Sequence, residues 1–291
     1  MATFINLLVS GLATGAIYAL VAIGFTLLWQ TSQTINFAQG EFVMVPAFLM
    51  LALINIGLPF PLAVLGGMAL SVLLLGLAFK RILVDPMLKH GTLPLAIATM
   101  ALSIFMKDAV KTFYSSEAQP FPALIPDIQI GVFGISVSLQ SLGVLALAIA
   151  AVLALQFLLG RTSLGHQMQA TAQNPGVARI LGIPVERMIL LTFVINAILV
   201  AFASLLVTPI YLAKFTSGDT LGQAAFIAAI VGGFNQIRGV IAGGLLLGVV
   251  DNLAATYVST AYRGAIPLVL LIAVILFRPQ GLFGASEERT V

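Results

Sequence analysis

The fold is decided by residues Phe4–Gln30, which read FINLLVSGLATGAIYALVAIGFTLLWQ and contain no charged side chain. A helix needs about 20 mostly apolar residues to cross the hydrocarbon core of a bilayer. This run exceeds that length and therefore predicts a membrane-spanning helix. No basic stretch precedes it, and no small-residue cleavage motif follows it at signal-peptide length. We therefore expect it to be retained as the first span.

The composition of the whole chain supports this interpretation. Of 291 residues, 60% are hydrophobic and only 8% are charged, whereas soluble domains carry about 25% charged residues. A surface facing water cannot be built from so little charge, so most of the surface should face lipid. Strands of a membrane β-barrel alternate over about 10 residues, but this chain has long continuous apolar runs. The predicted fold class is an all-α, polytopic membrane bundle.

Nine apolar runs bounded by turn residues are candidate membrane segments. They are Phe4–Gln30, Ile35–Ile56, Phe60–Val84, Leu93–Phe113, Leu139–Leu159, Met188–Leu212, Leu221–Phe234, Val240–Tyr257 and Ala265–Phe277. The seventh and eighth are short and rich in glycine, so they predict either one re-entrant pair or two spans. Totals of eight and nine segments both remain open.

The distribution of Lys and Arg predicts the orientation, because cytoplasmic loops are enriched in these residues. With the amino terminus outside, nine of the 13 basic residues fall inside. Those nine are Lys80, Arg81, Lys89, Arg161, Arg179, Arg187, Arg238, Arg278 and Arg289. The four outside are Lys107, Lys111, Lys214 and Arg263. We therefore expect an external amino terminus and a cytoplasmic carboxy terminus.

Several kinds of chemistry are disfavoured by the sequence. The chain has no cysteine, and its two histidines, His90 and His166, leave little scope for a histidine metal site. It also lacks the Gly-x-x-x-x-Gly-Lys-Ser/Thr phosphate loop of ATPases, and no nucleophile–base constellation stands out. A net charge of +3 does not indicate nucleic-acid binding. We expect neither a catalytic residue nor a metal or cofactor site on this chain.

Two connections between spans are long. The outer one, Tyr114–Gln140, contains three prolines and then alternates loosely over residues 128–139, which predicts a short hairpin with Gly131 and Gly134 as turn residues. The inner one, Gly160–Arg187, is the most polar stretch of the chain.

The inner connection contains a short helix with recognisable ends. Asn174 suits an N-cap, Pro175 suits the first helical position, and Gly182 suits the position after the helix. A second small helix, Gly165–Gln173, precedes it. Two interpretations are open: a rigid knob that docks in the groove of a cytoplasmic partner, or a capped loop helix that merely connects spans.

At this point the sequence resembles a known family. Residues Thr162–Arg187, TSLGHQMQATAQNPGVARILGIPVER, resemble the cytoplasmic coupling region of branched-chain amino acid ABC transporter permeases, and the LivH-type subunit in particular. The resemblance implies docking onto an ATPase subunit. The residues assigned to this coupling role are Gly165, Ala170, Asn174, Pro175, Ala178, Arg179, Gly182 and Ile183.

Other motifs resemble the same family in the same order. They are Ile35–Glu41 (INFAQGE), Val231–Gly239 (VGGFNQIRG) and Arg278–Gly284 (RPQGLFG). Many family members have histidine where Gln39 stands, so a role that needs a titrating side chain at that position is in doubt here. The likeness extends from about Gly11 to Gly284.

Two of these motifs are candidates for the translocation pathway. Ionisable residues within a membrane usually face a cavity or a partner, and glycine-interrupted segments often mark the route of a transporter. The predicted pathway residues are Asn36, Gln39, Gly40, Glu41, Gly232, Gly233 and Gly239. The alternatives are that Glu41 is a carboxylate satisfied near the cytoplasmic interface and that the glycines pack helices closely.

The resemblance implies an ABC importer permease fold, with residues 1–291 as one permease domain and residues 160–187 as its coupling segment. It implies a second permease subunit, identical or different, two cytoplasmic ATPases that bind ATP and Mg²⁺, and an extracytoplasmic binding protein. It also implies a multi-pass location in the bacterial inner membrane. Branched-chain or other neutral amino acids are the implied substrates, and urea, short amides or aromatic acids are alternatives.

Two rival classes remain. A stand-alone secondary transporter would need a coupling-ion site, for which Glu41 and Asp251 are the candidate acids within the spans. An intramembrane enzyme is disfavoured because no catalytic pair is evident.

Overall fold

The computed structural model describes residues 2–132, 135–259 and 264–284. It divides into two compact units. Unit 1 comprises Met1–Thr26, Leu124–Ile149 and Gln223–Val291, and unit 2 comprises Leu27–Ala123 and Ala150–Gly222. Each unit is considered by itself.

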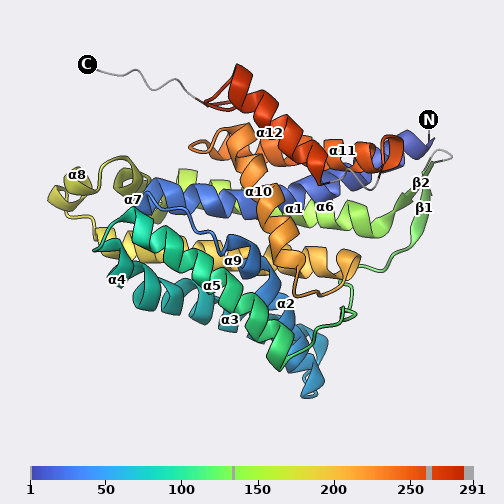
Figure 1. Cartoon of the computed structure of the whole chain (residues 1–291), viewed down its shortest axis with the longest axis horizontal. Helices are drawn as coiled ribbons and strands as arrows, with labels where there is room; N and C mark the ends of the chain where they lie inside the picture. The colour runs from blue at the N-terminus through green and yellow to red at the C-terminus, as the bar shows by residue number, and fades with distance from the viewer. Residues whose placement is uncertain (1, 133–134, 260–263, 285–291) are drawn as a thin grey trace. The chain divides into compact units, whose positions relative to one another are not determined.

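Helices dominate the described chain (Figure 1). In chain order the elements are α1 (Ala2–Ser32), α2 (Gln39–Asn55), α3 (Phe60–Ser71), η1 (Val72–Val84), α4 (Asp85–Leu88), α5 (Thr92–Phe113), β1 (Gln129–Val132), β2 (Ile135–Ser138), α6 (Leu139–Arg161), α7 (Ser163–Gln173), α8 (Pro175–Ile180), α9 (Val185–Tyr211), α10 (Ser217–Gly232), α11 (Ile237–Tyr257) and α12 (Ala265–Phe277). The element η1 has π-helical turns and continues α3 without a break. The predicted all-α fold is confirmed.

Each of the nine predicted membrane segments coincides with helix. Within the described residues, six helices are long and apolar enough to span a bilayer: α1, the continuous α3–η1–α4, α5, α6, α9 and α11. Two shorter apolar helices, α2 and α12, accompany them. The glycine-rich seventh and eighth segments are separate helices, α10 and α11. Of the two, α11 is among the six long apolar helices.

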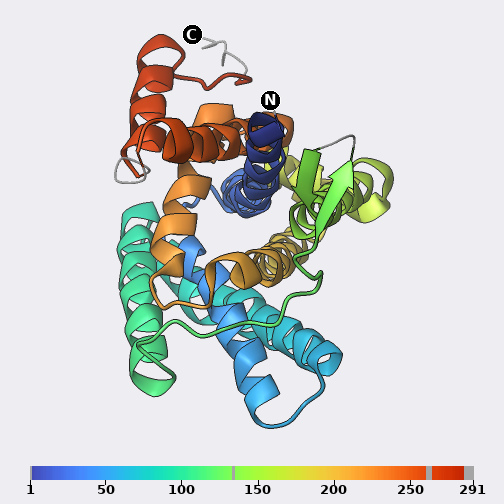
Figure 2. The ribbon, with the colours of Figure 1, turned by 90° about the vertical axis from the view of Figure 1, so that its right-hand side faces the viewer.

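The core of unit 2 is built around α2 and α9. Helix α2 packs against α3, α5 and α9, and η1 packs along α9; Figures 1 and 2 both show these helices side by side. Aromatic rings connect three of them, because Phe79 of η1 lies 4.9 Å from Phe42 of α2 and 5.8 Å from Phe193 of α9, measured between ring centroids. A further apolar cluster includes Met50 and Leu205.

In unit 1, α1 and α11 approach each other at glycines. A Cβ atom at Gly248 would lie 2.2 Å from the backbone nitrogen of Gly15, and one at Gly244 would lie 2.7 Å from that of Ala19. Gly11 meets Val249 in the same way, at 2.9 Å from its Cα. Only glycine allows the two backbones to come this close. We call Gly11, Gly15, Gly244 and Gly248 the glycine seam.

The hairpin predicted for residues 128–139 is confirmed as the antiparallel pair β1 and β2, in which Gln129 faces Ser138 (Figure 2). Gly131 lies within β1, opposite Ser136, so its predicted place in the turn is wrong. The other predicted turn residue, Gly134, lies outside the described residues.

Candidate functional site

The inner connection folds as two short helices that are held to the end of α6. The hydroxyl of Thr162 accepts a hydrogen bond from the backbone N–H of Gly165 at 3.0 Å and so caps α7. A Cβ atom at Gly165 would lie 2.1 Å from the carbonyl oxygen of Leu158, so only glycine fits there. The Gln169 amide donates to the carbonyl of Leu159 at 2.8 Å. Gly165 therefore fixes how α7 folds back on α6.

The amino-terminal end of α8 is capped as the sequence predicts. The side-chain oxygen of Asn174 accepts hydrogen bonds from the N–H groups of Gly176 and Val177, at 3.0 and 3.1 Å. Pro175 occupies the first helical position, where a missing N–H leaves no bond unmade. The backbone N–H of Asn174 bonds to the carbonyl of Ala170, at 3.1 Å, which links α8 to the last turn of α7.

The carboxy-terminal end of α8 is closed by a Schellman motif. Gly182 has a φ of +81°, which favours glycine. Its N–H bonds to the carbonyl of Arg179 at 3.1 Å, and the N–H of Ile183 bonds to that of Ala178 at 3.0 Å. Those two bonds define the motif. The predicted helix and both its ends are confirmed, because α8 is capped at each end by bonds within its own segment.

The two faces of α8 differ sharply. Ala178 is 1% exposed and packs inward, whereas Ile180 is 85% and Leu181 72% exposed, and Val177 is exposed beside them. Ala178 thus fills the base of the helix and does not itself present a surface for docking. The hydrophobic surface at the tip is formed by Val177, Ile180 and Leu181.

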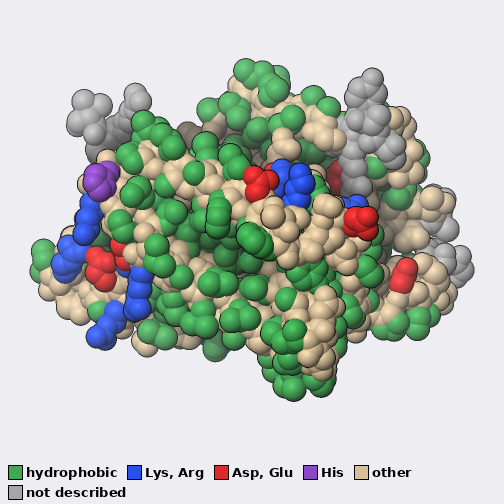
Figure 3. Space-filling model, turned by 60° about the horizontal axis from the view of Figure 1, so that its bottom comes forward, with side chains coloured by type: hydrophobic (Ala, Val, Ile, Leu, Met, Phe, Trp, Pro, Cys, Tyr) green, Lys and Arg blue, Asp and Glu red, His purple; other side chains and the backbone are tan. Residues whose placement is uncertain are grey.

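Charges gather at the same end of unit 2. Figure 3 shows Lys, Arg and acidic side chains together at the left edge, where α4, α7 and α8 lie, next to a broad hydrophobic surface. The basic residues Lys107 and Lys111, which are predicted to be outside, lie toward the carboxy-terminal end of α5. There Lys107 pairs with Asp219, and the ammonium of Lys111 lies 5.7 Å from the Phe215 ring centroid. Within unit 2, the basic residues predicted to be inside and outside are therefore at opposite ends.

The predicted pathway residue Gln39 forms a closed pair with Asn196 of α9. The Gln39 amide donates to the Asn196 side-chain oxygen at 2.7 Å, and the Asn196 amide donates back at 3.1 Å. Both side chains are fully buried. The amide of Asn36 also approaches the Gln39 oxygen, at 3.4 Å. We call Gln39 and Asn196 the amide pair.

Asn36 also explains why α2 begins later than the sequence indicates. Its side-chain oxygen accepts a hydrogen bond from the N–H of Ala38 at 3.0 Å, and Gln33 has a φ of +50°. An Asx-turn of this kind competes with helix. The apolar run predicted a segment from Ile35, whereas the helix starts at Gln39.

Gly40 and Glu41 lie where α2 meets α10. A Cβ atom at Gly40 would lie 2.2 Å from the carbonyl oxygen of Gly218, so the two backbones touch. Glu41 is buried, and Ser103, Lys107 and Asp219 lie around its carboxylate. This group, which we call the Glu41 cluster, joins α2, α5 and α10 inside unit 2. A mixed set of charges next to apolar helices can bind a zwitterion or hold the helices together.

The glycines of the second predicted pathway segment surround the turn between α10 and α11. A Cβ atom at Gly232 would lie 2.2 Å from the carbonyl oxygen of Gly239, and Gly233 has a φ of +108°. The backbone N–H of Leu282 bonds to the carbonyl of Val231 at 2.8 Å, so the chain after α12 returns to this turn. These contacts lie in unit 1, whereas Asn36–Glu41 lie in unit 2. That the two segments line one path remains a prediction.

The sequence did not identify Asn196 or Asp219 as partners. Asn196 is an amide within the apolar stretch of α9, and a lone amide at that depth is a signal that another polar group faces it. Asp219 stands in the first turn of α10 and gives no comparable signal. The partner of each could not be found without the packing of the helices.

Comparison with known proteins decides the family. The profile described as the branched-chain amino acid transport system / permease component matches residues 7–275. The chain belongs to this permease family. The resemblance stated from the coupling region and the other motifs is thereby confirmed.

Curated relatives match the permease over nearly its whole length. It is 32% identical to the high-affinity branched-chain amino acid transport system permease protein BraD of Pseudomonas aeruginosa, with 99% of this chain and 98% of the relative covered. It is 31% identical to LivH of Salmonella typhimurium and 30% identical to LivH of Escherichia coli K12, with the same coverage. The names of these proteins describe them as permease proteins of branched-chain amino acid transport.

One solved structure shares the permease's fold. PsaBC from Streptococcus pneumoniae in complex with Fab superposes with a TM-score of 0.52 at 14% identity, covering 96% of this chain and 92% of that one. At this identity the likeness concerns the fold alone.

Proposed function

We propose that this permease is the membrane-spanning translocation subunit of a binding-protein-dependent ABC importer for branched-chain or other neutral amino acids. The observation that carries the proposal is the full-length match to permeases named for branched-chain amino acid transport. Urea, short amides and aromatic acids remain alternative substrates. The permease would pair with a second permease subunit, identical or different, and with an extracytoplasmic binding protein.

In this proposal, α8 docks on a cytoplasmic ATPase. The helix is short, capped at both ends and presents Ile180 and Leu181 outward from a charged end of unit 2. Exposed apolar side chains rimmed by polar ones are typical of a protein–protein contact. ATP and Mg²⁺ would bind to the ATPase subunits, and their closure would push α8 and rock the permease pair between inward- and outward-facing states.

The docking proposal is tested with Leu181→Asp. A charge at this exposed position should prevent an ATPase subunit from co-purifying with the permease, without lowering the amount of permease in the membrane. Leu124→Asp is the matched control, because Leu124 is also exposed but lies in the connection predicted to be outside. Co-purification and uptake at wild-type levels in Leu181→Asp would contradict the docking role.

The orientation is part of the proposal: the end with α4 and α8 lies in the cytoplasm, and the amino terminus lies outside the inner membrane. The separation of basic residues within unit 2 supports it. The chain has no cysteine, so single cysteines at the exposed positions Ser116 and Gln173 can be labelled selectively. A membrane-impermeant thiol reagent added outside should reach the cysteine at position 116 only. Labelling of position 173 instead would reverse the orientation.

The rival function, a transporter that works alone, would place ion coupling at Glu41 or Asp251. The two proposals separate in liposomes that contain the purified chain without ATPases. Uptake driven by an ion gradient would favour the rival, whereas uptake that appears only with ATPases and ATP would favour the importer.

A further inference from the structure

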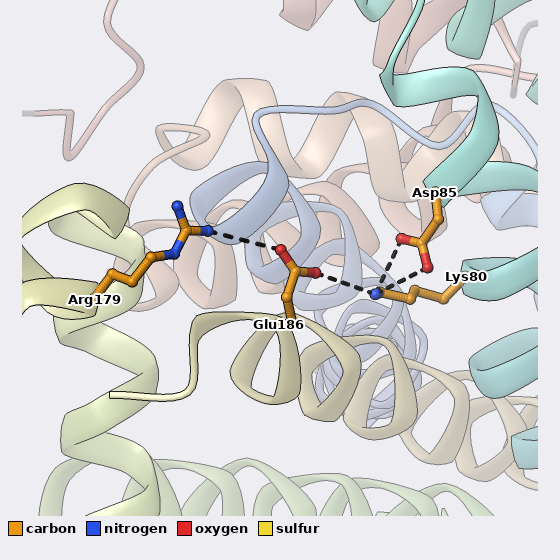
Figure 4. Close-up of polar contacts among 4 residues, drawn as sticks. All are labelled: Lys80, Asp85, Arg179 and Glu186. Carbon is orange, nitrogen blue, oxygen red and sulfur yellow. Dashed lines mark hydrogen bonds and ion pairs between the residues drawn. The ribbon is translucent and has the colours of Figure 1, made fainter. Parts of the chain in front are cut away.

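Four charged side chains form a line from α8 to the membrane helices of unit 2 (Figure 4). Arg179 Nη2 of α8 lies 3.8 Å from Glu186 Oε1, in the first turn of α9. The other oxygen of Glu186 lies 3.6 Å from the ammonium of Lys80 in η1. That ammonium lies 3.0 Å from each carboxylate oxygen of Asp85 in α4. We call Arg179, Glu186, Lys80 and Asp85 the charge chain.

The two ends of the charge chain differ in how firmly they are held. The Lys80 side chain is only 8% exposed, and a buried charge requires a partner. Asp85 is five residues away on the same continuous helix, so this pair should persist when α8 moves. Arg179 and Glu186 are 67% and 73% exposed, and pairs exposed to solvent are weak. The Arg179–Glu186 contact is therefore the link that a movement of α8 can make or break.

Glu186 is the shared member. Its two oxygens face different cations, one on α8 and one on η1, so losing Arg179 leaves the whole carboxylate to Lys80. Gly182 and Pro184 lie between α8 and α9, so the direct chain connection contains a turn rather than continuous helix. The Arg179–Glu186 contact of the charge chain joins α8 to α9 across that turn.

We propose that Glu186 is a positioning residue that transmits the movement of α8 to the membrane helices η1 and α9. The proposal rests on the proposed function, since it assumes that an ATPase moves α8. When α8 shifts, Glu186 exchanges Arg179 for a closer contact with Lys80, and the start of α9 is drawn toward η1. A clamp that only stabilised the fold would hold these helices equally in every state.

The test uses the complete transporter, with its ATPases and binding protein, reconstituted in liposomes. The measured quantity is substrate taken up per ATP hydrolysed. In Glu186→Gln this ratio should fall by about fivefold or more, the lower end of typical couplings between two sites. Glu186→Asp, which keeps the charge, should restore part of it. Arg81→Gln is the matched control, because Arg81 is an exposed cation next to Lys80.

A second variant separates transmission from stabilisation. Arg179→Gln leaves Lys80 with both carboxylates, so the fold should be unaffected while the ratio falls. The double variant Arg179→Gln with Glu186→Gln should be no worse than Glu186→Gln alone, since residues in one network are not additive. A wild-type ratio in Arg179→Gln, or losses that add in the double variant, would overturn the proposal. Failure of the proposed function would be recognised separately, because the wild-type chain itself would then not associate with an ATPase.

Discussion

Two helix contacts in this permease solve the same packing problem by opposite means. In unit 1, α1 and α11 meet at the glycine seam, where backbones touch because side chains are missing. In unit 2, α2 and α9 meet through the amide pair, and Phe79 of η1 packs against both Phe42 of α2 and Phe193 of α9. Lipid tails are as apolar as leucine, so hydrophobic burial alone does not hold helices together in a bilayer.

This difference predicts which kind of substitution should destabilise each helix contact most. A glycine seam depends on shape, and any added atom must displace backbone. An amide pair depends on reciprocity, because removing one amide costs the other, which stays buried, the two hydrogen bonds between them. Steric changes should therefore be most damaging in unit 1, and unmatched polar changes should be most damaging in unit 2.

The largest expected effect is in the glycine seam. Gly248→Val would place a Cβ atom 2.2 Å from the backbone nitrogen of Gly15, and we expect a loss of about 3 kcal/mol or more, the upper end of overpacking costs. Thermal unfolding of the purified permease in detergent measures it. Gly160→Val is the matched control, since a Cβ atom there meets nothing within 4 Å. Equal melting temperatures for the two variants would contradict the steric argument.

The second effect concerns the amide pair. Asn196→Leu removes both hydrogen bonds that join Gln39 to α9, and we expect destabilisation of about 1–2 kcal/mol, as for polar contacts between membrane helices. Gln39→Leu combined with Asn196→Leu should cost less than the sum of the single changes. Thr192→Val is the control, because the Thr192 hydroxyl bonds only to the Met188 carbonyl of its own helix among the bonds described. Additive losses in the double variant would mean that the two amides act separately.

The same double variant also tests the predicted pathway. If Gln39 serves only packing, replacing both amides should leave uptake per assembled transporter unchanged. If it lines the route, uptake should fall even when stability is largely recovered. Comparing uptake with the amount of assembled complex separates these outcomes.

Much of the fold could be predicted because apolar length is a strong signal. All nine segments are helical, and the ends of α8 follow from Asn174, Pro175 and Gly182, whose preferences are local. The hairpin followed from alternation and prolines in the same way. These features depend on residues close together in sequence.

Which side of each membrane helix is buried could not be predicted from the sequence, for a physical reason. In a soluble protein the polar side of a helix marks the surface, but a membrane helix is apolar on both its lipid side and its buried side. Phe105 of α5 is exposed and Leu206 of α9 is buried, although both stand in apolar runs. The inward face of Ala178, the partner of Gln39 and the Glu41 cluster all depend on this missing information.

The smallest expected loss of stability sharpens the comparison, because α1 and α11 also share a polar contact beside the glycine seam. The hydroxyl of Tyr18 donates to the Asp251 carboxylate at 3.2 Å, between α1 and α11. If backbone approach carries this contact, Tyr18→Phe should lower stability by only about 0.6 kcal/mol, the mean for hydrogen bonds between membrane helices. The matched change is Tyr257→Phe, because Tyr257 is exposed at the end of α11, and both variants are compared by thermal unfolding in the same detergent. A loss in Tyr18→Phe as large as that in Asn196→Leu would mean that hydrogen bonding, rather than the absence of side chains, holds both contacts.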